Sequence, residues 1–296
     1  MSKEYLTTAQ TAENWGVSER TVRNYCNTGR VPGAFFSGKS WRIPIEAKKP
    51  ERKKNTNELL NIIREQKEMR LKGGIYHKIQ IELTYNSNHI EGSRLTHDQT
   101  RYIYETNTIG VTDEALNVDD IIETTNHFRC IDKIIDCAEM PISENLIKEL
   151  HSILKTGTAD SRKDWFAVGD YKRFPNEVAD RATTPPENVH FEISKLIKQY
   201  NKEKHRSIED IIAFHVDFER IHPFQDGNGR IGRLILFKEC LKNNIVPFII
   251  DDNLKLYYYR GLKEWSDERG YLIDTCLSAQ DKFKTYLDYF KIPYTD

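Results

Sequence analysis

The sequence lacks the features that would assign it to a membrane, to the secretory pathway or to a disulfide scaffold. It has no apolar run long enough to cross a bilayer, and its mean hydropathy is −0.66. Its first residues, MSKEYLTTAQ, carry neither the apolar stretch nor the small-residue cleavage site of a secretory signal. Its five cysteines form no CxxC pair and no disulfide pattern. We therefore expect a cytoplasmic protein that makes no membrane contact and keeps its thiols reduced.

Charge is distributed unevenly along a chain whose net charge is only −1. Residues 1–54 hold eleven Lys and Arg against five Asp and Glu, a net charge of +6, so the remainder carries −7. The change coincides with EAKKPERKKNTNE, a hydrophilic stretch with one proline and no apolar period, which is typical of a linker. We therefore predict a basic domain at 1–47, a linker at 48–58 and an acidic domain at 59–296.

The basic domain has the pattern of a helix-turn-helix followed by a hairpin. A helix is expected from about Thr8 to Asn14, and Ser18 can cap a second helix whose Val22 faces inward. The next stretch, AFFSGKSWRIP, alternates aromatic and polar residues as the two strands of a wing do. In outline, the domain resembles the winged helix-turn-helix of the excisionase and MerR-like group.

This resemblance implies a face that binds duplex DNA. The second helix would turn polar and basic side chains outward, and the wing would place two more beside the phosphate backbone. The residues predicted to contact DNA are Ser18, Arg20, Thr21, Arg23, Lys39 and Arg42. Many small helical domains dock other proteins instead, and a charge of +6 also suits a solvated surface, so both interpretations stay open.

The rest of the chain has the period of helices. Apolar residues recur three and four apart in the runs 59–63, 75–83, 121–135, 147–154 and 193–197. One stretch departs from this pattern: FPNEVADRATTPPENV has prolines and β-prone pieces that suit a hairpin over a site as well as an ordinary surface loop. We therefore predict an all-α body with one small hairpin.

The stretch HPFQDGNGRIGR, residues 222–233, interrupts two helical segments. The segment before it is amphipathic and ends at Pro223, and RIGRLILFKECL after it is helical again. Its glycines let consecutive backbone N–H groups point into one concavity, and the next helix adds unpaired donors at its start. The loop is therefore typical of an anion-binding site, and phosphate is the expected ligand.

The charged residues of this loop are suited to binding a phosphate ligand. Arg230 and Arg233 lie three apart in the first turn of the helix, where they can clamp one polyphosphate. Asp226 offers a hard oxygen to Mg²⁺, which binds through a carboxylate and phosphate oxygens. His222 can take a proton from an incoming hydroxyl near neutral pH.

Three other interpretations of the loop explain less. GNGRIG fits G-x-G-x-x-G, with Asp251 at a suitable distance, but a dinucleotide fold requires a buried strand where a charged helix precedes it. A hydrolytic metal site that adds His215 and Asp217 to the histidine and aspartate of the loop would give the glycines and arginines no role. A flexible linker explains neither the histidine nor the arginines.

The residues of the loop resemble the Fic motif, HxFx(D/E)GNGRxxR, at every specified position. The resemblance implies a Fic-type helical bundle with a β-hairpin flap, which uses ATP and Mg²⁺ to transfer AMP to a Ser, Thr or Tyr hydroxyl of a target protein or of itself. The implied roles are general base for His222, metal ligand for Asp226, anion hole for Gly227, Asn228 and Gly229, and polyphosphate clamp for Arg230 and Arg233.

Two further stretches are similar to the family around its flap. The 174–189 hairpin looks like the flap that holds a target segment by strand addition, with Thr183, Thr184 and Val189 as its candidate residues. The preceding GDYKR is similar to the family's Gly-x-Tyr-Arg, although Lys172 stands where Arg is usual.

A third stretch, LKLYYYRGL, looks like the family's YYxAL segment, with Gly261 in place of Ala. The resemblance implies that Tyr258 and Tyr259 lie near the adenine. Tyrosines at helical spacing are more often part of a core, which is the competing interpretation.

The stretch TYNSNHIEGSRL contains a candidate switch. Ser87 and Glu91 are one turn apart on one helical face, and Gly92 can end the helix, so Glu91 would project from a rigid end held by the Ser87 hydroxyl. Alone, this would be a surface carboxylate beside a helix stop. Beside a Fic motif, it resembles the family's inhibitory motif, (S/T)xxxE(G/N). The resemblance implies an inhibitory helix at about 74–91, in which Glu91 pairs with Arg233 and denies it to the γ-phosphate.

The sequence therefore predicts an autoinhibited protein adenylyltransferase coupled to DNA binding. Three alternatives stay open. Glu91 could orient a water that removes AMP from a modified target, the nucleotide site could only sense ATP in a transcriptional regulator, or phosphocholine could be the transferred group. The target, the operator and the oligomeric state, a homodimer among the options, are not specified by the sequence.

Overall fold

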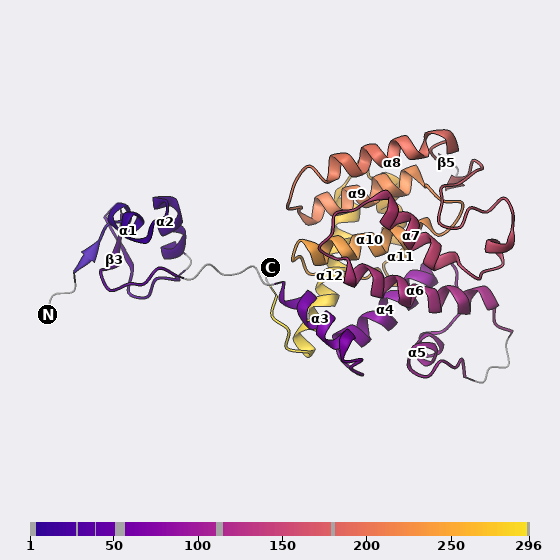
Figure 1. The fold of residues 1–296 in the computed structure, drawn as a ribbon, viewed down its shortest axis with the longest axis horizontal. Helices are drawn as coiled ribbons and strands as arrows, with labels where there is room; N and C mark the ends of the chain where they lie inside the picture. The colour runs from indigo at the N-terminus through magenta and orange to yellow at the C-terminus, as the bar shows by residue number, and fades with distance from the viewer. Residues whose placement is uncertain are drawn as a thin grey trace. The chain divides into compact units, whose positions relative to one another are not determined.

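The computed structural model describes residues 4–27, 29–38, 40–50, 57–110, 115–178 and 181–294. The chain divides into two compact units, residues 1–56 and 57–296, which are described separately (Figure 1). The predicted linker at 48–58 falls across this division, and most of it, residues 51–56, lies outside the described residues, as does Lys39.

The first unit is a helix-turn-helix closed by a small antiparallel sheet. Its elements are β1 (Tyr5–Leu6), α1 (Thr8–Trp15), α2 (Glu19–Asn27), β2 (Phe35–Ser37) and β3 (Ser40–Pro44). The sheet order is β1-β3-β2, and Ser37 pairs with Ser40 across the predicted wing turn. Val22, Cys26 and Ile43 form the centre of its core. The prediction of a winged helix-turn-helix is confirmed, with β1 as an additional strand.

The second unit is all-α apart from one hairpin, as predicted. Its helices are α3 (Glu58–Glu68), α4 (Ile75–Ile90), α5 (His97–Thr106), α6 (Val118–Asp136), α7 (Glu144–Lys155), α8 (Pro186–Tyr200), α9 (Ile208–Ile221), α10 (Asn228–Lys242), α11 (Lys255–Glu264) and α12 (Gly270–Tyr289). A short 3₁₀ turn at Asp160–Arg162 and the strands β4 (Glu177–Val178) and β5 (Arg181–Ala182) complete it. Within the described ranges, every helix is too short or too polar to cross a bilayer.

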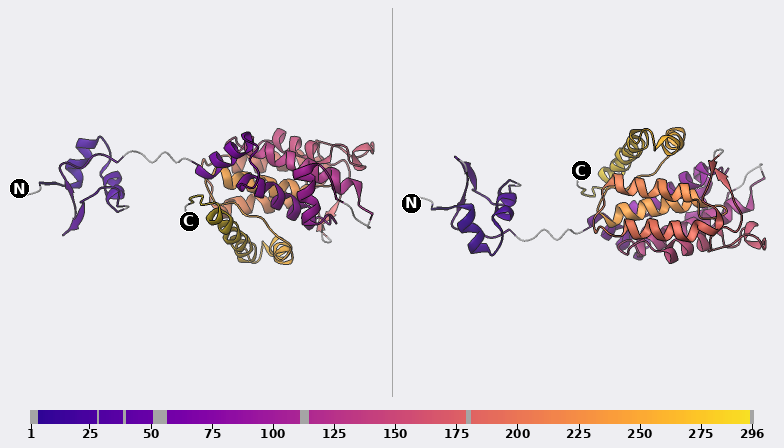
Figure 2. Two further views of the ribbon diagram at one scale, coloured as in Figure 1. Left: turned by 90° about the horizontal axis from the view of Figure 1, so that it is seen from below. Right: turned by 90° about the horizontal axis from the view of Figure 1, so that it is seen from above.

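Helix α10 lies at the centre of this unit. It contacts α9 on one side and α4, α6 and α7 on the others, and nearly all of its residues are buried (Figure 1). A helix buried on all sides need not show an amphipathic period, and in α10 the charged residues Arg230, Arg233, Lys238 and Glu239 are buried together with the apolar ones. Figure 2 shows the α11–α12 pair (yellow) covering one side of the bundle. Because α10 begins at Asn228, its N-terminus opens the candidate site.

The structure corrects two details of the predicted hairpin and adds two helices. Only β4 and β5 form strands within 174–189, because the prolines at 185 and 186 start α8. Val189 lies inside α8 and is fully buried, so it belongs to the core rather than to a flap. Helices α5, which has a capping box at Thr96 and Gln99, and α12 were not among the predicted segments.

Candidate active site

The motif loop is held in place by one backbone hydrogen bond and by two side chains, which pack and form hydrogen bonds. His222 ends α9 in the left-handed conformation, at φ 53°, and its N–H donates to the carbonyl of Phe218 at 3.0 Å. Phe224 is fully buried and stacks on His151 with ring centres 4.0 Å apart. The Asn228 amide accepts from the Phe224 N–H at 2.8 Å and donates to the Phe224 carbonyl at 2.9 Å. The Asn228 side chain therefore holds the loop, and only its backbone can face an anion.

The N-terminus of α10 has the properties of an anion nest. Gly227 occupies the N-cap position at φ 84°, and no side chain of the described residues caps the helix. The first backbone N–H groups of α10 and the positive end of its dipole are thus available to a phosphate. A side chain at Gly227 would press on Leu154, at 3.3 Å from an added Cβ.

Glu91 and Arg233 form the predicted ion pair. Oε1 of Glu91 lies 2.7 Å from Nη2 of Arg233, whose side chain is almost completely buried. Burial alone would lower the pKa of Arg233, but the Glu91 carboxylate outweighs it and raises this pKa. The Ser87 hydroxyl was expected to hold Glu91. Instead it accepts from Nε of Arg233 at 3.1 Å, and the Ser87 carbonyl accepts from Nη2 at 2.9 Å. Ser87 therefore orients the arginine.

The Glu91 carboxylate lies over the anion nest itself. Gly92 follows α4 at φ 97°, which turns the chain immediately after Glu91. A Cβ added at Gly229 would collide with Oε1 of Glu91 and would lie 2.9 Å from Nη1 of Arg233. The carboxylate thus occupies, as an anion, the space above the second motif glycine, Gly229. Gly229 is required there because any side chain would displace Glu91.

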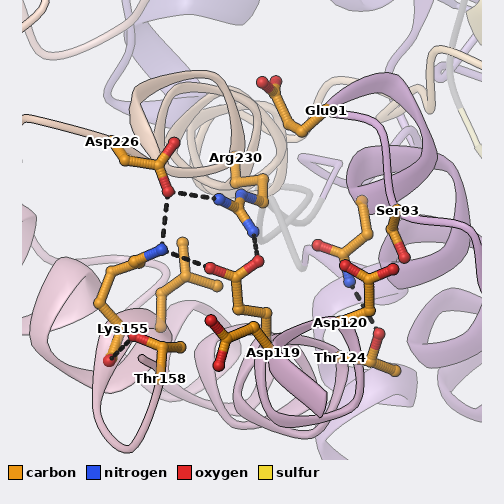
Figure 3. A network of polar contacts seen from close by, with 12 residues as sticks. Glu91, Ser93, Asp119, Asp120, Thr124, Lys155, Thr158, Asp226 and Arg230 are labelled. Carbon is orange, nitrogen blue, oxygen red and sulfur yellow. Dashed lines mark hydrogen bonds and ion pairs between the residues drawn. The ribbon is translucent and has the colours of Figure 1, made fainter. Parts of the chain in front are cut away.

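A closed ring of four charges holds the motif aspartate. Lys155 Nζ lies 2.7 Å and Arg230 Nη2 lies 3.1 Å from the same oxygen, Oδ2 of Asp226 (Figure 3). Both cations also contact Glu123 of α6, each through a different carboxylate oxygen. Arg230, predicted as a phosphate clamp, is therefore already paired with two carboxylates. Burial would raise the pKa of Asp226, but Arg230 and Lys155 lower it well below its usual range.

Asp226 fits a magnesium ligand of the kind that acts together with phosphate. Its carboxylate is ionised, and Figure 3 shows its second oxygen turned away from Lys155 and Arg230. Mg²⁺ commonly binds through one or two carboxylates plus substrate phosphates. No group of three or more His, Cys, Asp or Glu side chains in the described part of the chain could hold a metal by itself. His215, the alternative ligand, is buried with its Nε2 at 2.6 Å from the Tyr258 hydroxyl.

The charge ring predicts a large effect of Lys155 on stability. Only 3% of the Lys155 side chain and 13% of the Glu123 side chain are exposed, so Lys155→Met leaves Glu123 and Asp226 to share the single cation of Arg230. We expect the free energy of unfolding to fall by about 3 kcal/mol. The matched control is Lys133→Met. Lys133 joins Glu149 of α7 at 2.6 Å but is 33% exposed, and its loss should cost under about 1 kcal/mol. Urea denaturation of both variants measures this, and equal losses would contradict it.

His222 is suited to accept a proton. Burial, aided by the charge of Lys172, lowers its pKa to about 4, so the imidazole is neutral near pH 7. Its Nδ1 is buried and has no hydrogen-bond partner among the described residues. A neutral ring at the end of a rigid helix, next to an anion nest, can take a proton from a hydroxyl that approaches a bound phosphate.

The two tyrosines predicted near the adenine differ in exposure. Tyr258 is 1% exposed and hydrogen bonds to His215, so it belongs to the core and cannot stack on a base. Tyr259 is 42% exposed, and its hydroxyl donates to the Ile90 carbonyl, next to Glu91, at 3.2 Å. Of the two predicted tyrosines, Tyr259 is therefore the one exposed enough to contact a ligand.

The hairpin residues Thr183 and Thr184 lie directly after β5. The Thr183 hydroxyl accepts from Nζ of Lys172 at 2.6 Å and donates to the Asn176 carbonyl at 2.9 Å. It therefore closes the base of the hairpin. Both residues of each strand are exposed, which leaves the hairpin backbone accessible to an added strand.

In the first unit, the predicted DNA contacts divide into two groups. Ser18 and Thr21 bond to each other at the start of α2, where Ser18 accepts the Thr21 N–H at 3.2 Å. Arg23 is paired with Glu19 at 2.7 Å, and Arg20 and Arg42 have no such partner in the described residues; all three side chains are exposed.

Glu123 and Lys155 were given no role by the sequence patterns. Lys155 is 32 residues from Glu123 and 71 from Asp226, and each stands in an ordinary helical period. No local signal marks such a residue. Only the packing of α6 and α7 against α10 brings these charges together.

The fold and site define a helical protein with a helix-loop-helix whose second helix begins in an uncapped anion nest, a candidate base, and a carboxylate that lies over the nest. Residues 141–239 match the family model described as the Fic/DOC family, and residues 5–47 match one described as a helix-turn-helix domain. The chain therefore contains a Fic domain preceded by a helix-turn-helix domain.

Relatives and solved structures agree with this assignment. The chain is 26% identical over 187 residues to the protein adenylyltransferase Fic of Drosophila mojavensis. The matched region covers 60% of this chain and 35% of that protein. The chain is 25% identical over 214 residues to the protein of the same name from Nematostella vectensis, covering 69% and 48%. The chain thus spans roughly a third to a half of these relatives.

Among solved structures, a Fic-domain-containing signalling protein from Bacteroides thetaiotaomicron is similar with a TM-score of 0.58 and 25% identity, covering 79% of this chain and 91% of that one. Fic-1 from C. elegans has a TM-score of 0.60 at 21% identity, over 79% of this chain and 72% of that one. The second likeness shows the fold alone.

Proposed function

We propose that this protein is an autoinhibited adenylyltransferase that transfers AMP from ATP to a hydroxyl of a protein. The observation that carries the proposal is the Glu91 carboxylate, which lies over Gly229 of the anion nest and on Arg233. An anionic side chain there occupies the space that a phosphate would take. The Fic/DOC match and the names of the relatives support ATP as donor and AMP as the transferred group.

The chemistry follows from the charges around the loop. The neutral imidazole of His222 takes the proton of the target hydroxyl as the hydroxyl oxygen attacks the α-phosphorus of ATP. The bond from the α-phosphorus to the bridging oxygen breaks, and pyrophosphate leaves with the electron pair. The nest N–H groups and Arg233 stabilise the charge that develops on pyrophosphate. A Mg²⁺ ion held by Asp226 would supply further charge neutralisation for the triphosphate.

Autoinhibition follows from the sharing of Arg233. While Arg233 is paired with Glu91 and held by Ser87, its Nη2 and Nε donors are used within the protein. Release of Glu91 would make these donors available to the terminal phosphate. The pair is buried on the arginine side and 30% exposed on the glutamate side, so Glu91 is the partner that can move.

The experiment that tests the activity uses ATP labelled in either the α- or the γ-phosphate. With Glu91→Gly protein and Mg²⁺, we expect the α-label on protein and the γ-label in released pyrophosphate. Retention of the γ-label on protein would overturn AMP transfer. Release of AMP from a modified target without ATP would favour the reverse reaction, and tight ATP binding with no transfer would favour a sensor.

We further propose that the first unit binds duplex DNA through α2 and the wing. The support is its net charge of +6, the helix-turn-helix match, and the exposed guanidinium groups of Arg20 and Arg42. A double variant that combines Arg20→Ala with Arg42→Ala should bind a mixed-sequence duplex about tenfold more weakly than wild type at low salt. Fluorescence anisotropy measures this, with exposed Arg162→Ala in the second unit as control. Equal affinities for all three proteins would contradict it.

A further inference from the structure

Lys172 stands between the hairpin and the loop that carries His222. Its backbone N–H donates to the carbonyl of Pro223 at 2.8 Å, which fixes the chain before the hairpin to the motif loop. Its side chain is buried, and its ammonium donates to Oδ1 of Asn176 at 2.7 Å and to Oγ1 of Thr183 at 2.6 Å. Asn176 directly precedes β4 and Thr183 directly follows β5. One ammonium therefore holds both ends of the hairpin.

A second contact joins the same hairpin end to the motif loop. Nδ2 of Asn176 donates to the carbonyl of Phe224 at 3.0 Å, and Oδ1 of the same amide accepts from Lys172. The lysine thus fixes which way the Asn176 amide points. Because Phe224 is fully buried on His151, the hairpin base is tied to one of the most rigid points of the site.

The ammonium has an unusual environment for a buried cation. Among the residues that the structure describes, its hydrogen-bond acceptors are two neutral oxygens, and no carboxylate lies within ion-pair distance. Burial lowers the pKa of Lys172 to about 8. A buried charge without a counter-ion costs stability, so it is retained only where its hydrogen bonds are well formed. Its charge also contributes to the lowered pKa of His222, which places it close to that ring.

We propose that Lys172 is a positioning residue that locks the β4–β5 hairpin to the His222 loop, so that a target segment bound along the hairpin presents its hydroxyl to the imidazole. This inference rests on the proposed function, since it assigns the hairpin to target binding. The anchoring of the hairpin by the Lys172 ammonium can be tested by measurements that do not require enzymatic activity.

The first test measures how firmly the hairpin is held in the full-length protein. Arg173 and Arg181 are exposed on either side of β4. In Lys172→Met, which keeps the backbone bond to Pro223, trypsin should cut after these arginines about tenfold faster than in wild type, because hydrogen bonds to a charged group are lost. Lys172→Arg, which keeps a charged donor, should stay within about threefold of wild type. Mass spectrometry of the fragments measures each rate.

If Lys172→Met folds poorly, a second variant, Thr183→Val, still tests the proposal. Thr183→Val removes one acceptor at a partly exposed site and should act in the same direction, and combining it with Lys172→Met should add little. Wild-type cleavage rates in both single variants would overturn the proposal. An equal increase at tryptic sites within α12 would also overturn it, because the effect would then be general unfolding.

The last test separates the anchor from the proposed chemistry. In the Glu91→Gly background, Lys172→Met should lower self-modification by labelled ATP about tenfold, while ATP affinity by calorimetry changes less than about twofold. A matching loss of ATP affinity would place Lys172 in nucleotide binding and overturn its role at the hairpin. If no Glu91→Gly protein takes up label, the adenylyltransferase proposal fails, whereas the cleavage rates still decide the anchor.

Discussion

Glu91→Gly is expected to raise AMP incorporation by about ten- to a hundredfold over wild type. The change frees Arg233, and hydrogen bonds from a charged group to phosphate are worth about 1.5 to 3 kcal/mol. It also clears the space over Gly229, which the carboxylate fills. Intact-mass spectrometry after incubation with ATP and Mg²⁺ counts the AMP groups added to the protein or to an added target.

Three comparisons make this result specific. Glu91→Gln keeps the shape of the side chain without its charge and should fall between wild type and Glu91→Gly. Glu68→Gly removes an exposed carboxylate from the last turn of another helix, α3, and should behave as wild type. Ser87→Ala should activate less than Glu91→Gly because it leaves the ion pair in place. If Glu91→Gly and wild type take up equal label, Glu91 is not inhibitory.

His222→Ala is expected to lower AMP incorporation by about a hundredfold or more, whether or not Glu91 is present, because general base catalysis contributes roughly 10² to 10⁴. The loop should survive the change, since Phe224 and Asn228 hold it independently of the imidazole. ATP affinity should therefore change little. His205→Ala, at an exposed position before α9, is the matched control. If His222→Ala incorporates nearly as much label as the protein that retains His222, then His222 is not the general base.

The pH dependence of the Glu91→Gly variant tests the same residue. His222 works as a base only when neutral, and its pKa of about 4 keeps it neutral well below pH 7. We expect incorporation to stay level as pH falls from neutral to about 5 and to decline below that. Stability limits the range, because the unfolded chain protonates this histidine at its ordinary pKa of about 6.5 and the folded chain does not, so stability falls between those values. A decline centred near pH 6.5 would assign the base role to another group.

The central features of the site could be read from the sequence because each depends on residues close together in the chain. The glycines at 227 and 229, the end of α4 at Gly92 and the cap at Ser18 follow from local backbone chemistry. The wing was predictable for the same reason, since a two-strand turn has its own alternation.

The features that were missed depend on how helices pack. Tyr258 and Tyr259 are neighbours on α11, yet only the position of the helix against α9 decides that one is buried and the other exposed. Val189 was assigned to the flap because a Pro-Pro pair can end a hairpin or begin a helix, and here it begins α8. Glu123 and Lys155 carry ordinary charges in ordinary helical patterns until α6, α7 and α10 meet.

The helix that opens the nest, α10, is buried along nearly its whole length. Since α10 carries Gly229, Arg230 and Arg233 in its first two turns and core residues such as Phe237 further along, the phosphate end cannot fray without exposing the interior. Amide hydrogens of this helix should exchange with solvent only when the whole second unit unfolds. Mobility needed for turnover must then come from the elements around α10, such as the end of α4 that carries the partly exposed Glu91, while α10 itself stays in place.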